Sequence, residues 1–347
     1  MMTLLRTVRP NNRQRSARMR LAATLLFAAS VGCVVSLEDH QIPDMVVYSS
    51  VGTAPAVISA YTRETGRRAS LVTMSTGALL ARISAEAHHP RWDVVWFEGD
   101  DGAVAMDRAG LFARGTVPDL DWTPLGRTLL PADRSYEPTG FTLAGVFLER
   151  ADKAHTVQNW TQAFNTKRIG MADPALSGPA YQLLAGMLSI NGGWPAGQSA
   201  LLRMAANGML VAPSNAAVLT SLLTGRIDSA ITQSSAGIAL SRTDKRFLVA
   251  LPDPAFILPG VASVAADQPA SRRHTASDFL RFIMRPDIQI LRMHDTDADR
   301  LFWPVTNSPA QPDLPDPDGM TLMHLSPLIW GGRQAEVIDW FQRMIVR

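Results

Sequence analysis

Residues 45–112 alternate between segments typical of buried strands and segments typical of amphipathic helices. Short apolar runs such as "MVVYSSV" and "RWDVVWFEGD" are rich in β-branched and aromatic residues, which favour strands. Between these runs, apolar residues recur at helical spacing, and glycines follow two of the expected helices. The expected strands are 45–51, 69–74 and 91–100, and the expected helices are 54–66, 77–87 and 102–112. This alternation predicts an α/β fold with a doubly wound sheet.

Each expected strand of this region ends in a short polar turn that contains glycine. The three turns are "SSVG" at 49–52, "STG" at 75–77 and "FEGDDG" at 97–102. Ligands of doubly wound sheets bind beyond the carboxyl ends of the strands, where such turns lie. The sequence therefore predicts a binding edge built from these three turns.

A second set of strand, polar turn and helix follows in residues 168–240, where "LSGPAY" and "APSNAA" each begin a helix. Two such sets predict two lobes, each a doubly wound sheet flanked by helices, with segments 140–150 and 248–260 crossing between them. We expect residues 45–145 and 255–347 to form the first lobe and residues 146–254 the second. The amphipathic C-terminal segments, which include "TASDFLRFIMRPDIQILRM", are expected to be helical and to pack on the first lobe.

The first 33 residues have the pattern of an export signal. These residues contain six arginines and no acidic residue, and an apolar run extends from Leu21 to Val35. The run is short for a membrane span and suits a signal peptide, so we expect an exported, periplasmic protein. Cys33, the only cysteine, follows Gly32 as in a bacterial lipoprotein signal, although Ser30 stands where Leu is usual. Lipid attachment at Cys33 and plain cleavage both remain open.

The charge of the rest of the chain argues against nucleic-acid binding. The whole chain has 33 basic and 31 acidic residues, and without the six N-terminal arginines 27 basic residues face 31 acidic ones, a net charge of −4. No basic run with interleaved aromatic residues is present, so we expect no nucleic-acid partner. An anion bound by this chain would have to be held by a local site.

Catalytic and metal-binding motifs are weak. The chain has no G-x-S-x-G, no Walker sequence and no cysteine cluster, and its seven histidines are scattered except for the adjacent His88 and His89. We therefore expect neither an enzyme nor a cofactor. Asp100 and Asp101 fit interaction with a helix dipole better than catalysis. A metal site stays open as an alternative, with Glu98, Tyr136 or Asp100 as ligands.

Four turns instead share the chemistry of an anion site. Each combines hydroxyl or amide side chains with the bare N–H groups of a helix start, which together bind an anion without arginine. The turns are Ser49-Ser50, Ser75-Thr76-Gly77, Ser177-Gly178 and Ser214-Asn215. For any one of these turns alone, an N-cap is the favoured explanation, but four such turns from both predicted lobes favour an anion site. Trp96 would pack against an organic ligand or within the core, and Glu98 would meet a ligand amine or hydroxyl or remain solvated.

At this point the chain resembles the type 2 periplasmic solute-binding proteins of bacterial ABC importers, in the branch that binds ferric ion, thiamine, 2-aminoethylphosphonate and sugar phosphates. The resemblance lies in "VVYSS", "STGALLARISAE", "WDVVWFEGD", "ADPALSGPAYQLLAGML", "SNAAVLTSLLTGRIDSAITQSSAGIAL" and "ASDFLRFIMRPDIQ". It implies two lobes that close on a ligand. The implied contacts are Ser49, Ser50, Ser75, Thr76, Gly77, Trp96 and Glu98 in the first lobe, and Ser177, Gly178, Ser214, Asn215 and Gln233 in the second.

The resemblance also implies what the protein does. We expect a monomeric receptor that captures a small anionic organic solute, such as a phosphonate or a sugar phosphate, and delivers it to an inner-membrane ABC permease. Ferric members resemble one another in a tyrosine pair near the position of "QSSAG", where this chain has Ser234 and Ser235. That departure disfavours iron, but ferric ion or a ferric chelate remains one alternative. A sensor protein that feeds a two-component system is another.

Overall fold

The computed structural model describes residues 43–153, 157–307 and 311–346. The predicted export signal and Cys33 lie outside these residues. Residues 43–347 form one compact unit by their contacts. In the described parts of the chain, no helix combines the length and the apolar character that crossing a membrane requires.

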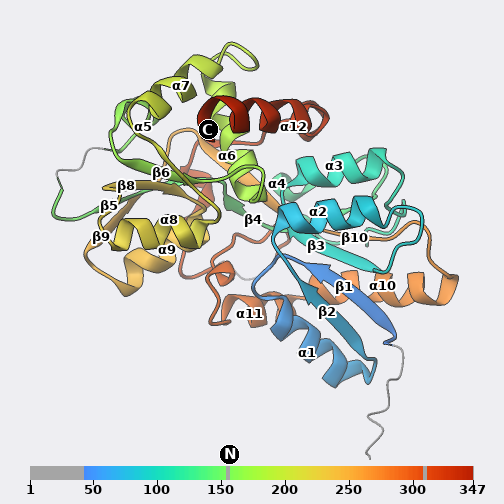
Figure 1. The fold of residues 1–347 in the computed structure, drawn as a ribbon. Coiled ribbons are helices and arrows are strands. Elements are labelled where there is room, and N and C mark those ends of the chain that lie inside the picture. The colour runs from blue at the N-terminus through green and yellow to red at the C-terminus, as the bar shows by residue number, and fades with distance from the viewer. Residues whose placement is uncertain (1–42, 154–156, 308–310, 347) are drawn as a thin grey trace, which may run out of the picture. The chain divides into compact units, whose positions relative to one another are not determined.

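The first sheet contains the three strands expected from residues 45–100. Strand β1 (Met45–Ser49) lies between the parallel strands β2 (Ala69–Thr73) and β3 (Val94–Glu98) (Figure 1). Strand β10 (Ala255–Val264) runs antiparallel to β3, and it pairs with β4 (Glu137–Leu143) and with the short strand β11 (Leu322–Met323). The expected alternation of strands and helices in this region is confirmed.

Helices cover both faces of this sheet because neighbouring strand residues point in opposite directions. Val47 of β1 belongs to the core beneath α1 (Ala54–Thr65) and α10 (Ala270–Ile283). Tyr48 belongs to the core beneath α2 (Thr76–Ala85) and α3 (Asp100–Arg108). Figure 1 shows the two helix pairs on opposite sides of the strands.

The second sheet has the strand order β7-β6-β8-β5-β9. Its strands are β5 (Val146–Arg150), β6 (Ile169–Ala172), β7 (Leu210–Ala212), β8 (Ser229–Thr232) and β9 (Phe247–Ala250). Its helices are α5 (Trp160–Asn165), α6 (Gly178–Ile190), α7 (Gln198–Ala206), α8 (Asn215–Leu223) and α9 (Ser234–Thr243). Phe147 and Leu148 of β5 again point into two different cores.

Two segments pass from one sheet to the other. The chain leaves β4 and enters β5 through Ala144 and Gly145, and it returns from β9 to β10 through residues 251–254. A methyl group added at Gly145 would lie 2.7 Å from Leu183 Cδ1 and 2.8 Å from Ile231 Cγ2, so the first crossing has no room for a side chain. These crossings lie within the segments 140–150 and 248–260 that the sequence predicted, whereas the exact lobe boundaries stay a prediction.

The C-terminal region differs from expectation in two places. The segment 275–293 is helical as expected but is divided between two helices, because α10 ends at Ile283 and α11 (Pro286–Met293) begins with a proline, which cannot continue the preceding helix. Helix α12 (Pro327–Phe341) does not pack on the first sheet alone. It contacts α3 and α6, and Tyr181 donates a 2.6 Å hydrogen bond to the carbonyl of Trp330. The remaining short helices are α4 (Pro124–Thr128), η1 (Ala298–Arg300), η2 (Pro317–Gly319) and η3 (Gln342–Val346).

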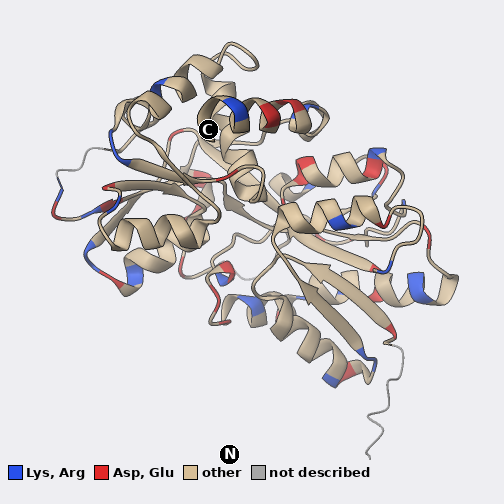
Figure 2. Cartoon of the chain, viewed as in Figure 1, with Lys and Arg blue, Asp and Glu red and all other residues tan. Residues whose placement is uncertain are grey.

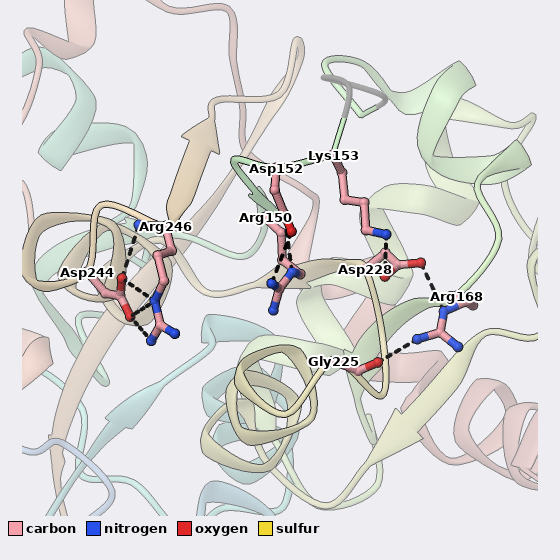
Figure 3. Close-up of polar contacts among 8 residues, drawn as sticks. All are labelled: Arg150, Asp152, Lys153, Arg168, Gly225, Asp228, Asp244 and Arg246. Atoms are coloured by element: carbon pink, nitrogen blue, oxygen red, sulfur yellow. Dashed lines mark hydrogen bonds and ion pairs between the residues drawn. The ribbon is translucent and has the colours of Figure 1, made fainter.

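Charged side chains of both signs are interspersed over the elements in Figure 2. A group of ion pairs lies at one end of the second sheet, where basic and acidic residues neutralise one another. The pairs are Arg150 with Asp152, Arg168 and Lys153 with Asp228, and Arg246 with Asp244 (Figure 3). Exposed pairs of this kind contribute little stability.

Glu137 of β4 is a buried carboxyl whose two oxygens have no hydrogen-bond partner in the described structure. Burial raises the pKa of Glu137 well above its usual value. The folded protein therefore keeps a proton that the unfolded chain loses. Between the pKa of Glu137 in the unfolded chain and its raised pKa in the folded protein, the free energy of unfolding falls with rising pH by up to about 1.4 kcal/mol per pH unit.

We expect Glu137→Gln to reduce the loss of stability between about pH 5 and about pH 8, because an amide does not ionise. Urea unfolding at several pH values measures this. Glu64→Gln is the control, because the Glu64 side chain is 51% exposed beside Arg285. An unchanged pH slope in Glu137→Gln would show that Glu137 does not carry the buried proton.

Candidate functional site

Two turns of the first sheet come together at the carboxyl ends of its strands. Ser49 at the end of β1 is in register with Thr73 of β2 and Trp96 of β3, so the turns that follow are neighbours. The hydroxyl of Thr76, at the start of α2, donates a 3.1 Å hydrogen bond to Ser50 Oγ. Two of the polar side chains that the sequence predicted at this edge, Ser50 and Thr76, are therefore in direct contact.

The turn before α2 also lies against the turn before α6 of the second sheet. A methyl group added at Gly77 would lie 2.7 Å from the carbonyl oxygen of Ala175. One added at Gly178 would lie 2.7 Å from both the carbonyl oxygen of Glu98 and Thr76 Cγ2. Only glycine permits this close approach of the two backbones.

A cavity of about 260 Å³ lies where these two turns meet. Its polar end is lined by four of the residues that the sequence predicted, Thr76, Gly77, Ser177 and Gly178, and α12 covers another side with Gln334, Ala335 and Ile338. Ser177 makes no side-chain capping bond to α6, unlike Ser75 and Ser214 at their helices. The Ser177 hydroxyl therefore remains available toward the cavity.

A direct side-chain hydrogen bond joins the two sheets beside this cavity. Gln233, which precedes α9, donates to Glu98 Oε1 at 2.7 Å and lies 3.3 Å from Thr142 Oγ1. Burial is the main cause that raises the pKa of Glu98 well above its usual value, and the charge of Asp299 adds to it. Glu98 can therefore donate a hydrogen bond as a neutral carboxyl group or accept one as a carboxylate, depending on the group that contacts it.

Asp299 is placed where a bound anion was expected. Its Oδ2 accepts a 2.7 Å hydrogen bond from the backbone N–H of Gly52, just before α1, and its Oδ1 lies 3.4 Å from Ser235 Oγ at the start of α9. The pKa of Asp299 is raised to about 6, mainly by burial and also by the charge of Asp297, while the hydrogen bond from Gly52 N–H opposes the shift. The chain thus supplies its own carboxylate between these helix starts.

Arg292 of α11 provides the compensating positive charge. Its guanidinium is 4.9 Å from the Trp96 ring centroid and donates a 2.6 Å hydrogen bond to the Thr139 carbonyl. Burial lowers the pKa of Arg292 to about 9, and Asp299 and Glu98 oppose that shift. We call this set the inter-sheet site; it consists of Ser50, Gly52, Thr76, Gly77, Glu98, Ser177, Gly178, Gln233, Ser235, Arg292, Asp297 and Asp299.

The other predicted ligand residues lie in different settings. The Ser49 hydroxyl donates to the Trp96 carbonyl at 2.8 Å and accepts from Val51 N, and Trp96 itself is fully buried. Ser75 and Ser214 accept hydrogen bonds from Ala78 N and Ala217 N, as N-caps do. Asn215 Oδ1 accepts from Thr232 Oγ1 at 3.0 Å. Their roles in ligand binding stay predictions.

Sequence reasoning missed most of the charged part of the site. It named Glu98 as a contact and otherwise only neutral groups, whereas Asp297, Asp299 and Arg292 also meet here. The signal was the acidic run "DTDAD" at 295–299, which directly follows the α11 segment. Nothing in the run itself shows that it returns to the ends of β1 and β3.

The alternative of a metal site has no support from side-chain placement. In the described parts of the chain, no group of at least three His, Cys, Asp or Glu side chains could hold a metal ion. Tyr136 and Asp100 line a separate cavity that does not include Glu98.

Comparisons with known proteins agree with this architecture. A family model described as bacterial extracellular solute-binding protein matches residues 56–318. No curated protein sequence matches the chain significantly.

Three solved structures illustrate the similarity of the fold. The periplasmic binding protein AfuA from Actinobacillus pleuropneumoniae, with exogenous fructose-6-phosphate bound, has a TM-score of 0.76 and 16% identity over 87% of this chain and 98% of that one. A periplasmic thiamin binding protein gives 0.72 and 18% over 87% and 96%. Iron-bound HitA from Pseudomonas aeruginosa gives 0.71 and 16% over 86% and 98%.

The predicted type 2 periplasmic-binding fold is confirmed by these neighbours. The family match covers most of the chain. By its sequence and its fold, the chain belongs to the bacterial extracellular solute-binding proteins, the receptors that serve ABC importers.

Proposed function

We propose that this receptor captures a small organic solute with an anionic group at the inter-sheet site and presents it to an ABC permease from the periplasmic side. The observation that carries the proposal is the meeting of Thr76 and Gly77 with Ser177 and Gly178 around one cavity. Hydroxyl groups and helix starts from both sheets would then hold the same anion through charge-assisted hydrogen bonds.

The acidic part of the inter-sheet site narrows the chemistry of the solute. Glu98, Asp297 and Asp299 repel a bare anion but accept hydrogen bonds from hydroxyl or ammonium groups. A solute that carries a phosphoryl or similar group at one end and hydroxyl or amine groups at the other satisfies both parts. A sugar phosphate, as in the AfuA structure, and an aminoalkylphosphonate both have this form.

Closure follows from the contact between the two turns. A ligand that contacts both sheets binds the arrangement in which they touch better than one in which they are apart, and so shifts the population toward it. The two crossings through Ala144-Gly145 and residues 251–254 are where the backbone would bend.

A thermal-shift screen of the purified protein tests the proposal. The panel contains phosphate, phosphonates, sugar phosphates, sulfonates, thiamine phosphates and ferric citrate. A ligand at a hundredfold excess over its Kd stabilises the native state by about 2.7 kcal/mol. Stabilisation by ferric salts alone would favour the iron alternative. If no member of the panel stabilises the protein, the proposed ligand class is wrong.

Thr76→Val and Ser177→Ala test whether both turns hold the ligand. Each substitution removes a hydroxyl at the cavity, and we expect each to weaken binding of the best panel ligand by about 1–3 kcal/mol in calorimetry. Thr243→Val, at the exposed end of α9, is the control. Unchanged affinity in Thr76→Val would show that the Thr76 hydroxyl does not bind the ligand and that Thr76 serves only at the start of α2.

Asp299→Asn tests whether the chain's own carboxylate competes with the ligand's anionic group. Because Asp299 has a raised pKa of about 6, it loses its charge as the pH falls below that value, so wild-type affinity should rise from about pH 8 to about pH 5. A sulfonate is the probe, since its charge is constant over this range. The variant should bind it about tenfold more tightly at pH 8 and show a flat profile. Weaker binding of this probe in Asp299→Asn, with Asp316→Asn unchanged, would contradict competition between Asp299 and the anionic group.

Gly77→Ala tests the proposed closure. The added methyl group cannot fit 2.7 Å from the Ala175 carbonyl, so the two turns must separate. We expect a larger radius of gyration in solution scattering with ligand present, and at least about tenfold weaker binding. Gly319→Ala is the control, because nothing lies within 4 Å of its added methyl group. Equal scattering of Gly77→Ala and wild type would contradict closure through this contact.

A further inference from the structure

A second cavity, of about 390 Å³, lies between α3, the segment that follows α4, and the start of α12. This size is within the range of small-molecule sites. None of its lining residues belongs to the inter-sheet site. They include the apolar side chains of Val104, Leu129, Leu130, Pro131, Pro327 and Leu328.

The hydroxyl of Tyr136 lines this cavity without a partner. Tyr136 is only 3% exposed, and no hydrogen bond of its side chain is present within the described residues. Burial raises the pKa of Tyr136, and the charges of Asp100 and Asp107 add to the shift, so the phenol keeps its proton. The Tyr136 hydroxyl is open to the cavity rather than sealed in the core, and a ligand in the cavity would give it a hydrogen-bond partner.

Asp100 is a second buried polar group on the cavity wall. Its side chain is 1% exposed, and its Oδ2 is 2.6 Å from His324 Nε2. Its Oδ1 is buried and has no partner in the described structure. Asp100 at the start of α3 interacts favourably with the helix dipole, but this does not satisfy the second oxygen.

Asp107 is in the last turn of the same helix, where the dipole disfavours a carboxylate. Burial raises the pKa of Asp107, and the nearby charge of Asp133 raises it further. Asp133 also lines the cavity and pairs with the exposed Arg114 at 3.3 Å. Two carboxylates therefore face each other here at an unfavourable helix end.

Two basic residues, Arg108 and His324, also line this cavity, and His324 is paired with Asp100. Arg108 lines the cavity from the exposed end of α3, and its Nη1 reaches to 3.0 Å from the position of a methyl group on Gly332. The carboxylates are not grouped as metal ligands in the described residues. Carboxyl and phenol groups beside apolar side chains suit an organic cation with a hydrocarbon body.

We propose that this cavity is a second ligand site that binds an organic ammonium ion with an apolar body. The ammonium group would donate to Asp107 and to the lone pair of the Tyr136 hydroxyl. The hydrocarbon part would pack against Val104, Leu129 and Leu130. The proposal goes beyond the inter-sheet site and does not depend on which solute that site binds.

Calorimetry of the intact protein with 2-phenylethylamine tests the proposal, and 2-phenylethanol is the neutral probe of the same shape. We expect the amine to bind at least about tenfold more tightly than the alcohol at pH 7. Failure of the amine to bind at millimolar concentration, or equal binding of the two probes, would overturn the proposal.

Variants assign the amine to this cavity. Asp107→Asn removes a charge, and we expect it to weaken amine binding about tenfold. Tyr136→Phe removes only the unpartnered hydroxyl, and we expect a loss of about threefold. Asp119→Asn is the matched control, because its side chain is 96% exposed. Thr76→Val, at the inter-sheet site, should also leave amine binding unchanged. Wild-type affinity in both Asp107→Asn and Tyr136→Phe, with unchanged melting temperatures, would place the amine elsewhere.

Discussion

The contact between the turn that contains Gly77 and the turn that contains Gly178 is the constraint on which the rest of the functional architecture depends. A β-carbon on Gly77 would meet the carbonyl of Ala175, and one on Gly178 would meet the carbonyl of Glu98 and the side chain of Thr76. This close approach brings the starts of α2 and α6 to one cavity, and it places Gln233 within 2.7 Å of Glu98. Larger residues at these two positions would keep the sheets apart, and the polar groups would then face water separately.

The charges near this contact give the inter-sheet site two unlike ends. Hydroxyl groups and helix starts surround the cavity at Thr76 and Ser177, whereas Asp299 and Glu98 lie beside Arg292 at the ends of β1 and β3. A buried charge is tolerated only when it is paired or hydrogen-bonded. Asp299 meets this requirement through Gly52 N and Ser235, and an incoming solute has to replace or complement those contacts. In the proposed function, the specificity of the site would come from this division as much as from recognition of the anionic group.

Helix α12 connects the two cavities of the molecule. The cavity at Thr76 and Ser177 is lined by Gln334, Ala335 and Ile338 of this helix, and the cavity at Tyr136 by Pro327 and Leu328. The same helix packs on α3 and is tied to α6 by the hydrogen bond from Tyr181 to the Trp330 carbonyl. The C-terminal segment is therefore part of both lining surfaces, a position that its amphipathic pattern does not reveal.

The sequence by itself determined the local elements, the type of fold and half of the candidate site. Strand and helix periods, glycine stops and polar turns are local properties, so β1 to α3 and the turns at Thr76 and Ser177 could be located from the residues alone. The tertiary structure alone decided which polar groups share one place. Asp299 reaches Gly52 across 247 positions, and Tyr136 faces Asp100 and Asp107 from another segment. Such meetings depend on the packing of whole sheets and helices, and no local pattern encodes them.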